Sequence, residues 1–334
     1  MKPYLFLFFC FLGSALLPPS IILEAAEPTP SPETTLPSQK HFSYTDAVIL
    51  GVVEGTTEYL PISSTGHLIL ISEALGLNEE STAHPTRAHK PLSSDQKFTQ
   101  KEAINAYIIF IQSGAIAAVL VLYWNRFRQM GAGLLGGNRK GLLILRNLTI
   151  AFIPAGITGF LLHDWIEEKL FSPIPVVVAL IAGAGLMFGV ELWKKHRAKH
   201  QSTTTKGPEV HELSMRASLS IGLLQCVALW PGTSRSMMTL IGGYLVGLRP
   251  AQAAEFTFLL GFVTLSAAAL YKSWQSGSAM VETLVIGPTL VGWLVAALSA
   301  GLAIKGLVYF LTRYGLKPFA LYRICLAILV LTVI

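Results

Sequence analysis

Apolar runs long enough to cross a bilayer recur along this sequence. Ile104 to Trp124, Pro175 to Trp193 and Leu284 to Ile304 each contain at most one charged residue, and a membrane-spanning helix needs about 20 such residues. Of the 334 residues, 52% are hydrophobic and only 13% are charged, whereas a soluble domain has about 25% charged residues. Inside a bilayer every backbone polar group needs an internal partner, which helices provide. The sequence therefore predicts an all-α polytopic membrane protein.

One apolar segment, Asp46 to Leu60, carries two glutamates in its interior. Glu54 and Glu58 are four residues apart, so on a helix they share one face. A charge at the bilayer centre costs about 2.5–3.5 kcal/mol, and such residues are functional by default. Pro61 should end this helix, and a short polar cluster follows it: Ser63, Ser64, Thr65, Gly66 and His67. We expect acids, hydroxyls and an imidazole to be gathered around a helix break.

The apolar piece after this break, His67 to Leu77, is too short to span a membrane alone. Together with Asp46 to Leu60 it predicts a re-entrant helical hairpin whose non-helical tip is Pro61 to Thr65. Broken backbone at membrane depth is tolerated only where protein or a wet cavity surrounds it. The tip should therefore lie inside the protein.

The pattern then restarts in the second half of the chain. Ala217 to Trp230 is apolar, Pro231 to Thr239 is polar, and Leu240 to Leu248 is a second short apolar piece. Gly51-Val-Val-Glu54 lines up with Gly222-Leu-Leu-Gln225, and Pro61-Ile-Ser-Ser-Thr65 with Pro231-Gly-Thr-Ser-Arg235. Three predicted spans follow each hairpin, so the halves 46–200 and 212–334 would form an inverted-topology repeat. Such repeats place their sites near the midplane, where the broken helices meet.

Charge sets the expected orientation and excludes one class of partner. The segments from Arg126 to Arg146 and from Lys194 to Arg216 are basic, whereas His163 to Lys169 is acidic. Basic loops stay on the cytoplasmic side, so the first hairpin should open to the extracytoplasmic side. The net charge of +6 reflects these loops, and nucleic acid is not expected as a partner. Residues 1–26 resemble a signal peptide or an uncleaved signal anchor, and 27–45 a linker.

The second tip contributes a cation. Arg235 offers a planar fork of donors that matches phosphate, and Gly232 would let the backbone approach a ligand. A helix over Leu240 to Leu248 would point its N-terminus, which favours anions, at the tip. Alternatively, Arg235 serves only as an ion-pair partner for Glu54 or Glu58.

Facing tips would combine carboxylates, hydroxyls, an imidazole and a guanidinium. Such a site fits a phosphate or diphosphate on a lipid, with Glu54 and Glu58 holding a divalent cation, Mg²⁺ or Ca²⁺, between them and the diphosphate. A hydroxyl beside His67 could be a nucleophile with the imidazole as its base. A metal-bound water, with Glu58 or His67 as base, is the alternative attacking group.

Two motifs carry a family resemblance. Glu54-Gly-Thr-Thr-Glu58 followed by Leu60-Pro-Ile-Ser-Ser-Thr-Gly-His67, and later Pro231-Gly-Thr-Ser-Arg-Ser-Met-Met-Thr239, resemble the undecaprenyl-diphosphate phosphatase family, also known for bacitracin resistance. The similarity runs from about Asp46 to Ile334. It implies an enzyme of the bacterial plasma (inner) membrane that converts undecaprenyl diphosphate to undecaprenyl phosphate and phosphate. This reaction recycles the carrier lipid of peptidoglycan synthesis.

The resemblance also implies roles for individual residues. Glu54 and Glu58 would bind the cation, Ser64 would be the nucleophile, His67 its base, and Arg235 the phosphate ligand. Supporting substrate contacts would come from Ser63, Thr65, Gly232, Ser234, Ser236 and Thr239. A type-2 phosphatidic acid phosphatase would need a second histidine after Ser234-Arg235, and Ser236 to Leu248 contains none. A transporter or flippase for an anionic prenyl-phosphate lipid is the alternative function, and a homodimer is a further expectation.

Overall fold

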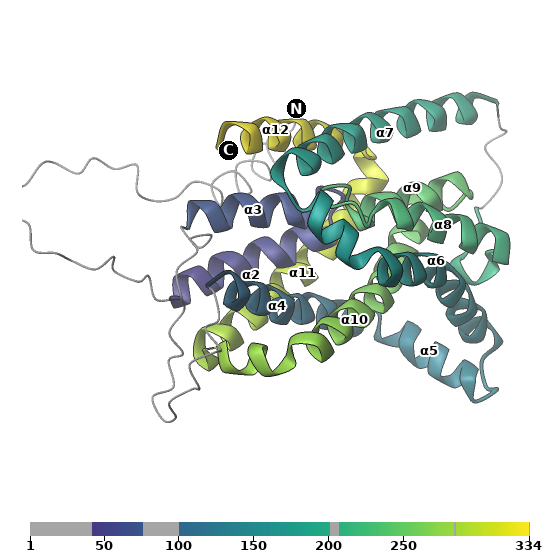
Figure 1. Ribbon diagram of the computed structural model, residues 1–334. Coiled ribbons are helices and arrows are strands. Elements are labelled where there is room, and N and C mark those ends of the chain that lie inside the picture. Colours follow the sequence, from purple (N-terminus) through teal and green to yellow (C-terminus); the bar gives the residue numbers. More distant parts are fainter. Residues whose placement is uncertain (1–41, 76–99, 201–206, 284, 334) are drawn as a thin grey trace, which may run out of the picture.

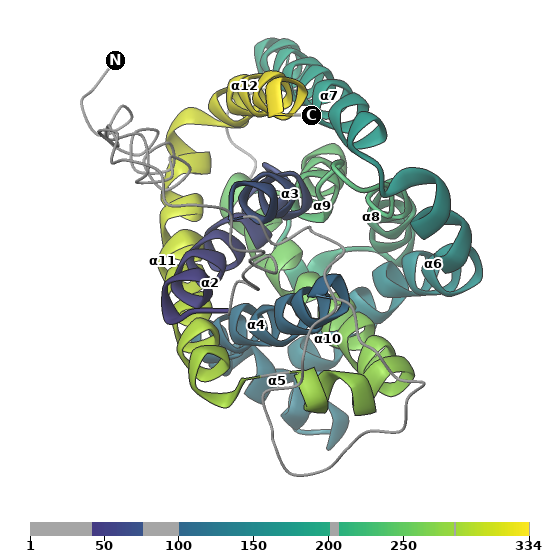
Figure 2. The same ribbon diagram turned by 60° about the vertical axis from the view of Figure 1, so that its left-hand side comes forward.

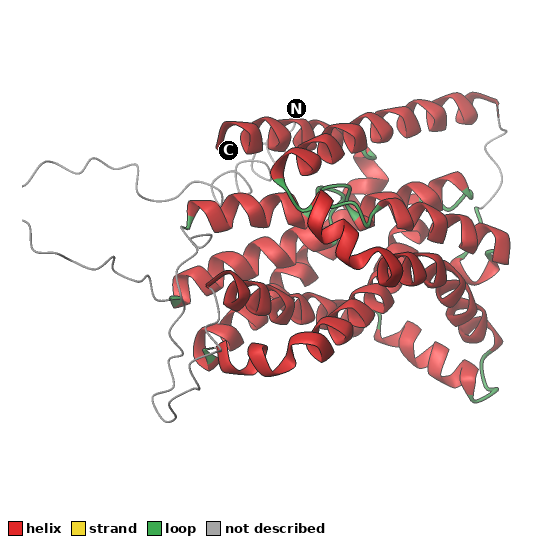
Figure 3. Ribbon diagram, viewed as in Figure 1, coloured by secondary structure: helices red, strands yellow, loops and turns green. Residues whose placement is uncertain are grey.

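The computed structural model describes residues 42–75, 100–200, 207–283 and 285–333 (Figure 1). The predicted signal segment 1–26 and nearly all of the linker 27–45 lie outside these residues. All regular structure in the described ranges is helical, without a strand (Figure 3). The prediction of an all-α protein is confirmed.

The helices of the first half are α2 (Tyr44–Glu58), α3 (Ser64–Ala74), α4 (Gln100–Leu122), α5 (Trp124–Leu134), α6 (Arg139–Leu170) and α7 (Pro173–His200). Those of the second half are η1 (Val210–Glu212), α8 (Met215–Val227), α9 (Arg235–Leu245), α10 (Pro250–Thr283), α11 (Ile286–Tyr314) and α12 (Lys317–Val333).

Five of the described helices, α4, α6, α7, α10 and α11, are long and apolar enough to cross a membrane. Large apolar side chains on their outer faces are exposed, among them Val121, Phe160 and Leu302. In a polytopic protein such faces contact lipid. The sixth expected span, Pro318 to Ile334, corresponds to α12, whose 17 residues lie at the lower limit for crossing. The chain is a multi-pass membrane protein.

Both broken hairpins are present. α2 begins at a capping box, in which the Asp46 amide donates to Ser43 Oγ at 3.1 Å and the Ser43 amide donates to Asp46 Oδ2 at 2.9 Å. The helix stops at Glu58, and α3 begins after the tip. The α8–α9 pair repeats this helix–break–helix arrangement.

The two tips share an unusual backbone conformation. Ser63 and Ser234 are the only non-glycine residues in the described chain with positive φ, and both have φ of 74°. Each is the N-cap of the helix that follows, with its hydroxyl accepting from the amide three residues on, Gly66 and Met237 respectively. Residues with a side chain rarely adopt this conformation. Its presence at the same position of both tips indicates that the two helix breaks share one local structure.

Several sequence predictions about helix limits are wrong. The first short helix begins at Ser64 rather than His67, and the second begins at Arg235 rather than Leu240, because Ser63 and Ser234 cap them. Residues 126–134, expected in the basic loop from Arg126 to Arg146, lie in the helix α5, which ends before Gly136 (φ 80°). Asn138 then caps α6 by accepting from the Gly141 amide at 3.0 Å.

Each hairpin packs on a span from the other half. α2 lies along α11, and α8 along α6 (Figure 2). A Cβ on Gly51 would lie 2.6 Å from the Gly292 carbonyl oxygen, and one on Gly222 would lie 2.9 Å from Ala151 Cα. Small residues at these crossings let the backbones touch. The inverted repeat and its limits, 46–200 and 212–334, stay predictions.

The tips meet in the interior, where the loop segments gather near the middle of Figure 3. Ser236 Oγ donates to the Leu60 carbonyl oxygen at 2.7 Å, and Ser234 Oγ donates to the same oxygen at 3.5 Å. The second tip is thus tied to the backbone of the first. This contact brings the two polar clusters into one site.

Candidate active site

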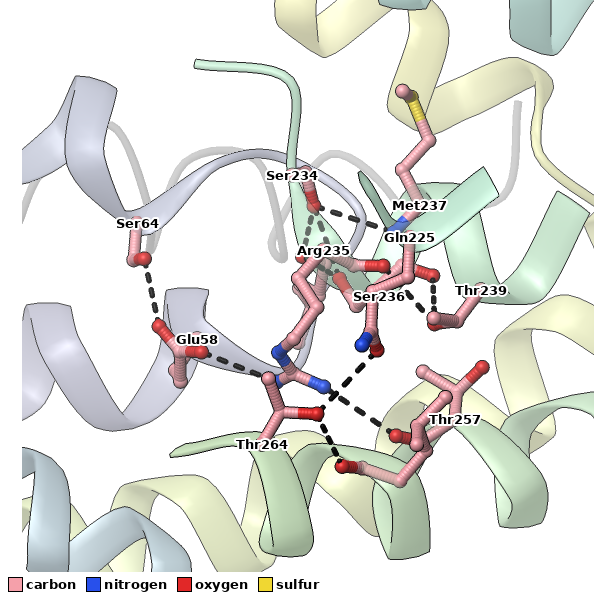
Figure 4. Close-up of polar contacts among 12 residues, drawn as sticks. Glu58, Ser64, Gln225, Ser234, Arg235, Ser236, Met237, Thr239, Thr257 and Thr264 are labelled. Carbon is pink, nitrogen blue, oxygen red and sulfur yellow. Dashed lines mark hydrogen bonds and ion pairs between the residues drawn. The ribbon is translucent and has the colours of Figure 1, made fainter. Parts of the chain in front are cut away.

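The centre of the site is a chain of three side chains that crosses from one tip to the other. Ser64 Oγ donates to Glu58 Oε2 at 2.7 Å, and Arg235 Nη2 donates to Glu58 Oε1 at 3.1 Å (Figure 4). Glu58 is the last residue of α2, Ser64 the first of α3 and Arg235 the first of α9. The helix breaks therefore place all three groups together.

Arg235 retains donor capacity beyond this ion pair. Its Nη1 donates to the Thr257 carbonyl oxygen at 3.4 Å, and its guanidinium lies over the Tyr59 ring with a centroid distance of 5.6 Å. Nε is buried and has no hydrogen-bond partner in the described chain. The guanidinium fits against Gly261, where a Cβ would lie 2.8 Å from Cζ. An oxyanion could use the remaining N–H groups together with the N-terminus of α9.

Glu54 is the second acid of the site and is fully buried. Neither carboxylate oxygen has a hydrogen-bond partner within 3.5 Å among the described residues, and Gln112 of α4 is the neighbouring polar side chain that interacts with it. A buried carboxyl group whose oxygens accept no close hydrogen bond is costly. It is suited to bind a cation or a proton, so the residues present fit a divalent metal.

Protein ligands alone would not enclose such a metal. No group of three or more His, Cys, Asp or Glu side chains in the described part of the chain is arranged to hold one. Mg²⁺ commonly binds through one or two carboxylates, waters and substrate phosphates. Glu54 and Glu58 match that limited ligand set.

His67 occupies a different place from the one that we expected. Its Nδ1 lies 2.6 Å from the Ser63 carbonyl oxygen and its Nε2 2.7 Å from the Tyr322 hydroxyl. No hydrogen bond joins His67 to Ser64, although both residues are described. The Ser64 hydroxyl instead donates to Glu58, so the expected Ser64–His67 pair is not formed.

Most of the predicted substrate donors have structural partners. Ser234 and Ser236 bind the Leu60 carbonyl oxygen, and Thr239 Oγ1 donates to the Arg235 carbonyl oxygen in its own helix at 3.0 Å. Ser63 Oγ caps α3. Thr65, the remaining predicted hydroxyl donor, is half-buried, and no side-chain hydrogen bond of this kind is found for it among the described residues.

Gly232 lies at a close approach between the second tip and α7, and its predicted contact with substrate stays a prediction. At φ of 92°, a Cβ there would lie 2.6 Å from the Val176 carbonyl oxygen. The residue therefore lets the tip pack against α7. Its own carbonyl oxygen accepts from Arg323 Nη2 at 2.9 Å, so the approach is to protein.

Sequence reasoning missed two residues of α12, Tyr322 and Arg323. Tyr322 contacts His67, and Arg323, with 0% of its side chain exposed, is the largest fully buried side chain in the described chain. An arginine within an apolar segment is the signal that could have identified this position. Tyr322 has no comparable signal, because tyrosine is common in membrane helices.

Comparison with known proteins agrees with the motifs. The family described as "Bacitracin resistance protein BacA" matches residues 47–329. A protein of Sorangium cellulosum named undecaprenyl-diphosphatase is 41% identical over 287 residues, which cover 86% of this chain and 85% of that protein.

Two further relatives carry the same name. The Clostridium tetani protein is 35% identical over 85% of this chain and 94% of its own length. The Maridesulfovibrio salexigens protein is 38% identical over 85% of this chain and 96% of its own length. With both tips, the paired hairpins and nearly all spans inside the matched region, this chain belongs to the bacitracin resistance protein BacA family.

Proposed function

We propose that this chain is an undecaprenyl-diphosphate phosphatase, which releases the terminal phosphate of that lipid and thereby confers bacitracin resistance. Relatives of near-equal length that are named for this activity support the substrate. The observation that carries the chemistry is the Ser64–Glu58–Arg235 chain at the contact of the tips. It unites a nucleophile, a base and an anion ligand.

In the first step, Ser64 Oγ attacks the terminal phosphorus while its proton passes to Glu58 Oε2. The bond between that phosphorus and the bridging oxygen breaks. Glu58 returns the proton to this oxygen, and undecaprenyl phosphate leaves. Glu58 is the base in this scheme because the 2.7 Å hydrogen bond already aligns the proton. The guanidinium N–H groups of Arg235 donate hydrogen bonds to the phosphate oxygens, where negative charge is concentrated.

In the second step, water attacks the phosphoserine. Glu58 takes a proton from this water and returns it to Ser64 Oγ as the phosphorus–Oγ bond breaks, which releases inorganic phosphate. The same carboxylate thus serves as base and acid in both halves of the reaction. This cycle regenerates the hydroxyl and the carboxylate.

The proposed cofactor is a divalent cation, Mg²⁺ or Ca²⁺. Glu54 and Glu58 would hold it beside the diphosphate, and the ion would offset the repulsion between carboxylates and phosphate oxygens. The buried oxygens of Glu54, which have no hydrogen-bond partner within 3.5 Å among the described residues, support this assignment. We place the protein in the bacterial inner membrane with its site open to the extracytoplasmic side, because of the charge of its loops. A homodimer stays a prediction.

The test is phosphate release from undecaprenyl diphosphate by the purified protein in detergent. We expect multiple turnovers with Mg²⁺ or Ca²⁺, loss of release after chelation, and recovery when the cation returns. The alternative function predicts a different result: a carrier would bind the lipid and leave its phosphate count unchanged. Activity that is insensitive to chelation would remove the cation from the proposal but leave the serine mechanism.

A further inference from the structure

Two neighbouring residues of α12 hold one hairpin tip each. Tyr322 contacts the first tip through His67, and Arg323 contacts the backbone of the second. α12 lies beside α7 along one edge of the molecule (Figures 1 and 2). None of the hydrogen bonds described for these two residues reaches Glu58, Ser64 or Arg235, so they act on the site through other groups.

Arg323 joins the second tip to α7. Its Nη1 donates to the Thr233 carbonyl oxygen at 3.2 Å, and its Nη2 donates to the carbonyl oxygens of Gly232 and Ala179, both at 2.9 Å. Its Nε donates to the Leu180 carbonyl oxygen at 3.2 Å. The guanidinium thus contacts two residues of the tip and two of α7. A lysine could not span both sides, because its donors radiate from a single nitrogen.

Tyr322 fixes His67, and His67 fixes the strained residue of the first tip. A carbonyl oxygen only accepts, so Nδ1 of His67, which faces the Ser63 carbonyl oxygen, must carry the hydrogen. In a neutral imidazole Nε2 then accepts from the Tyr322 hydroxyl. The two rings also stack, with centroids 5.5 Å apart and planes 6° from parallel.

These contacts affect the position of Ser64. Ser63, at φ of 74°, has a conformation that a side chain disfavours and that its surroundings must hold. His67 binds the carbonyl oxygen of that residue, which directly precedes Ser64. The second tip has no equivalent, since the residue four positions after Ser234 is Met238; there Arg323 binds the tip instead.

We propose that Tyr322 and Arg323 are positioning residues that set the two tips against each other, so that Ser64, Glu58 and Arg235 are aligned for the reaction. In this arrangement His67 acts on the backbone at Ser63 instead of taking the Ser64 proton. The proposal rests on the proposed phosphatase function for its kinetic consequences. The contacts themselves do not depend on it.

The kinetic test compares matched substitutions in the full-length purified protein. Tyr322→Phe removes one hydroxyl and keeps the ring, and Arg323→Lys keeps the charge and removes the fork. The controls are Tyr309→Phe and Arg313→Lys on α11, where Tyr309 is 61% exposed and pairs with Arg313. For undecaprenyl diphosphate we expect kcat to fall about tenfold in Tyr322→Phe with KM unchanged, since one part-buried hydrogen bond is lost that does not involve Glu58, Ser64 or Arg235.

Arg323→Lys should lower kcat by at least as much, again without a change in KM, and both controls should match the wild type. A Tyr322→Phe protein with wild-type kcat, or one in which only KM rises, would overturn the proposal. If Arg323→Lys does not accumulate as folded protein, the Tyr322→Phe and Tyr309→Phe pair decides alone.

A second readout is independent of activity. In ¹⁵N-histidine-labelled protein, the resonances lost in His67→Gln belong to His67. We expect a protonated Nδ1 and an unprotonated Nε2, with the Nε2 resonance shifting in Tyr322→Phe but not in Tyr309→Phe. A protonated Nε2, or no shift, would contradict the Tyr322 contact. If the wild type released no phosphate, the phosphatase function would fail, and these spectra would still test the arrangement of α12 and the tip.

Discussion

The Ser64 hydroxyl donates to the Glu58 carboxylate across a helix break, at 2.7 Å between Oγ and Oε2. The two residues end one helix and begin the next, and Arg235 reaches the other oxygen of the same carboxylate from the second hairpin. One carboxylate thus connects Ser64 of one tip with Arg235 of the other. In the proposed mechanism these two residues are the attacking group and the anion ligand.

Glu58→Gln should separate proton transfer from hydrogen bonding at this carboxylate. Glutamine can still accept from Ser64 but cannot take its proton, so we expect kcat to fall by about 10²- to 10⁴-fold. The measurement is steady-state phosphate release. The matched variant is Glu54→Gln. If Glu54 binds the cation, this variant should also lose activity, and a higher Mg²⁺ concentration should partly restore it. Near-normal kcat in Glu58→Gln would exclude Glu58 as the base.

Arg235→Lys should weaken phosphate binding while keeping the positive charge. A lysine loses the fork that contacts both Glu58 and the Thr257 carbonyl oxygen. We expect kcat/KM to fall by about 10- to 100-fold, in keeping with one or two lost charge-assisted hydrogen bonds. Arg128→Lys, at an exposed position of α5, provides the control. Equal kcat/KM in both variants would mean that Arg235 is only a structural ion pair.

Gly222→Ala tests the close packing of the second hairpin. The new Cβ would lie 2.9 Å from Ala151 Cα in α6, and overpacking of this kind destabilises by about 1–3 kcal/mol. Thermal unfolding in detergent should therefore shift to lower temperature. Gly301→Ala is the control, because its Cβ would meet nothing within 4 Å and alanine favours a helix. An unchanged midpoint in Gly222→Ala would contradict the α6–α8 packing.

The orientation of the site can be tested by labelling. Asp164 is exposed near the end of α6 that we predict to lie outside, and Arg128 is exposed on α5, which we predict to lie on the cytoplasmic side. In a background with Cys10, Cys226 and Cys325 replaced by alanine, Asp164→Cys should react with an impermeant thiol reagent in intact cells. Arg128→Cys should react only after lysis. The reverse pattern would invert the topology.

The sequence predicted both broken hairpins, because the signals for them are local. Pro61 and Pro231 interrupt apolar runs, and acids or an arginine stand beside each break. The sequence allowed Arg235 to form an ion pair with either Glu54 or Glu58. The spacing of the two acids on α2 does not say which carboxylate faces the second tip. The structure selects Glu58 and leaves the carboxylate oxygens of Glu54 without a hydrogen-bond partner within 3.5 Å among the described residues.

What was missed depends on tertiary contacts. The start of α9 at Arg235 requires Ser234 to adopt a positive φ, which its sequence does not signal. The expected contact between His67 and Ser64 rested on their closeness in sequence. The partners of His67 are instead the Ser63 backbone and Tyr322, which lies 255 positions further along the chain. Contacts over such a separation leave no local pattern.

The most direct measurement is a rapid-quench reaction with undecaprenyl diphosphate labelled on its terminal phosphate, followed by peptide mapping. We predict labelled phosphate on the peptide that contains Ser64, formed within one turnover and absent from Ser64→Ala, which should also lose nearly all phosphate release. A Ser64→Ala protein that retained most of its activity, with no labelled wild-type peptide at any quench time, would contradict the account and assign the attack to water.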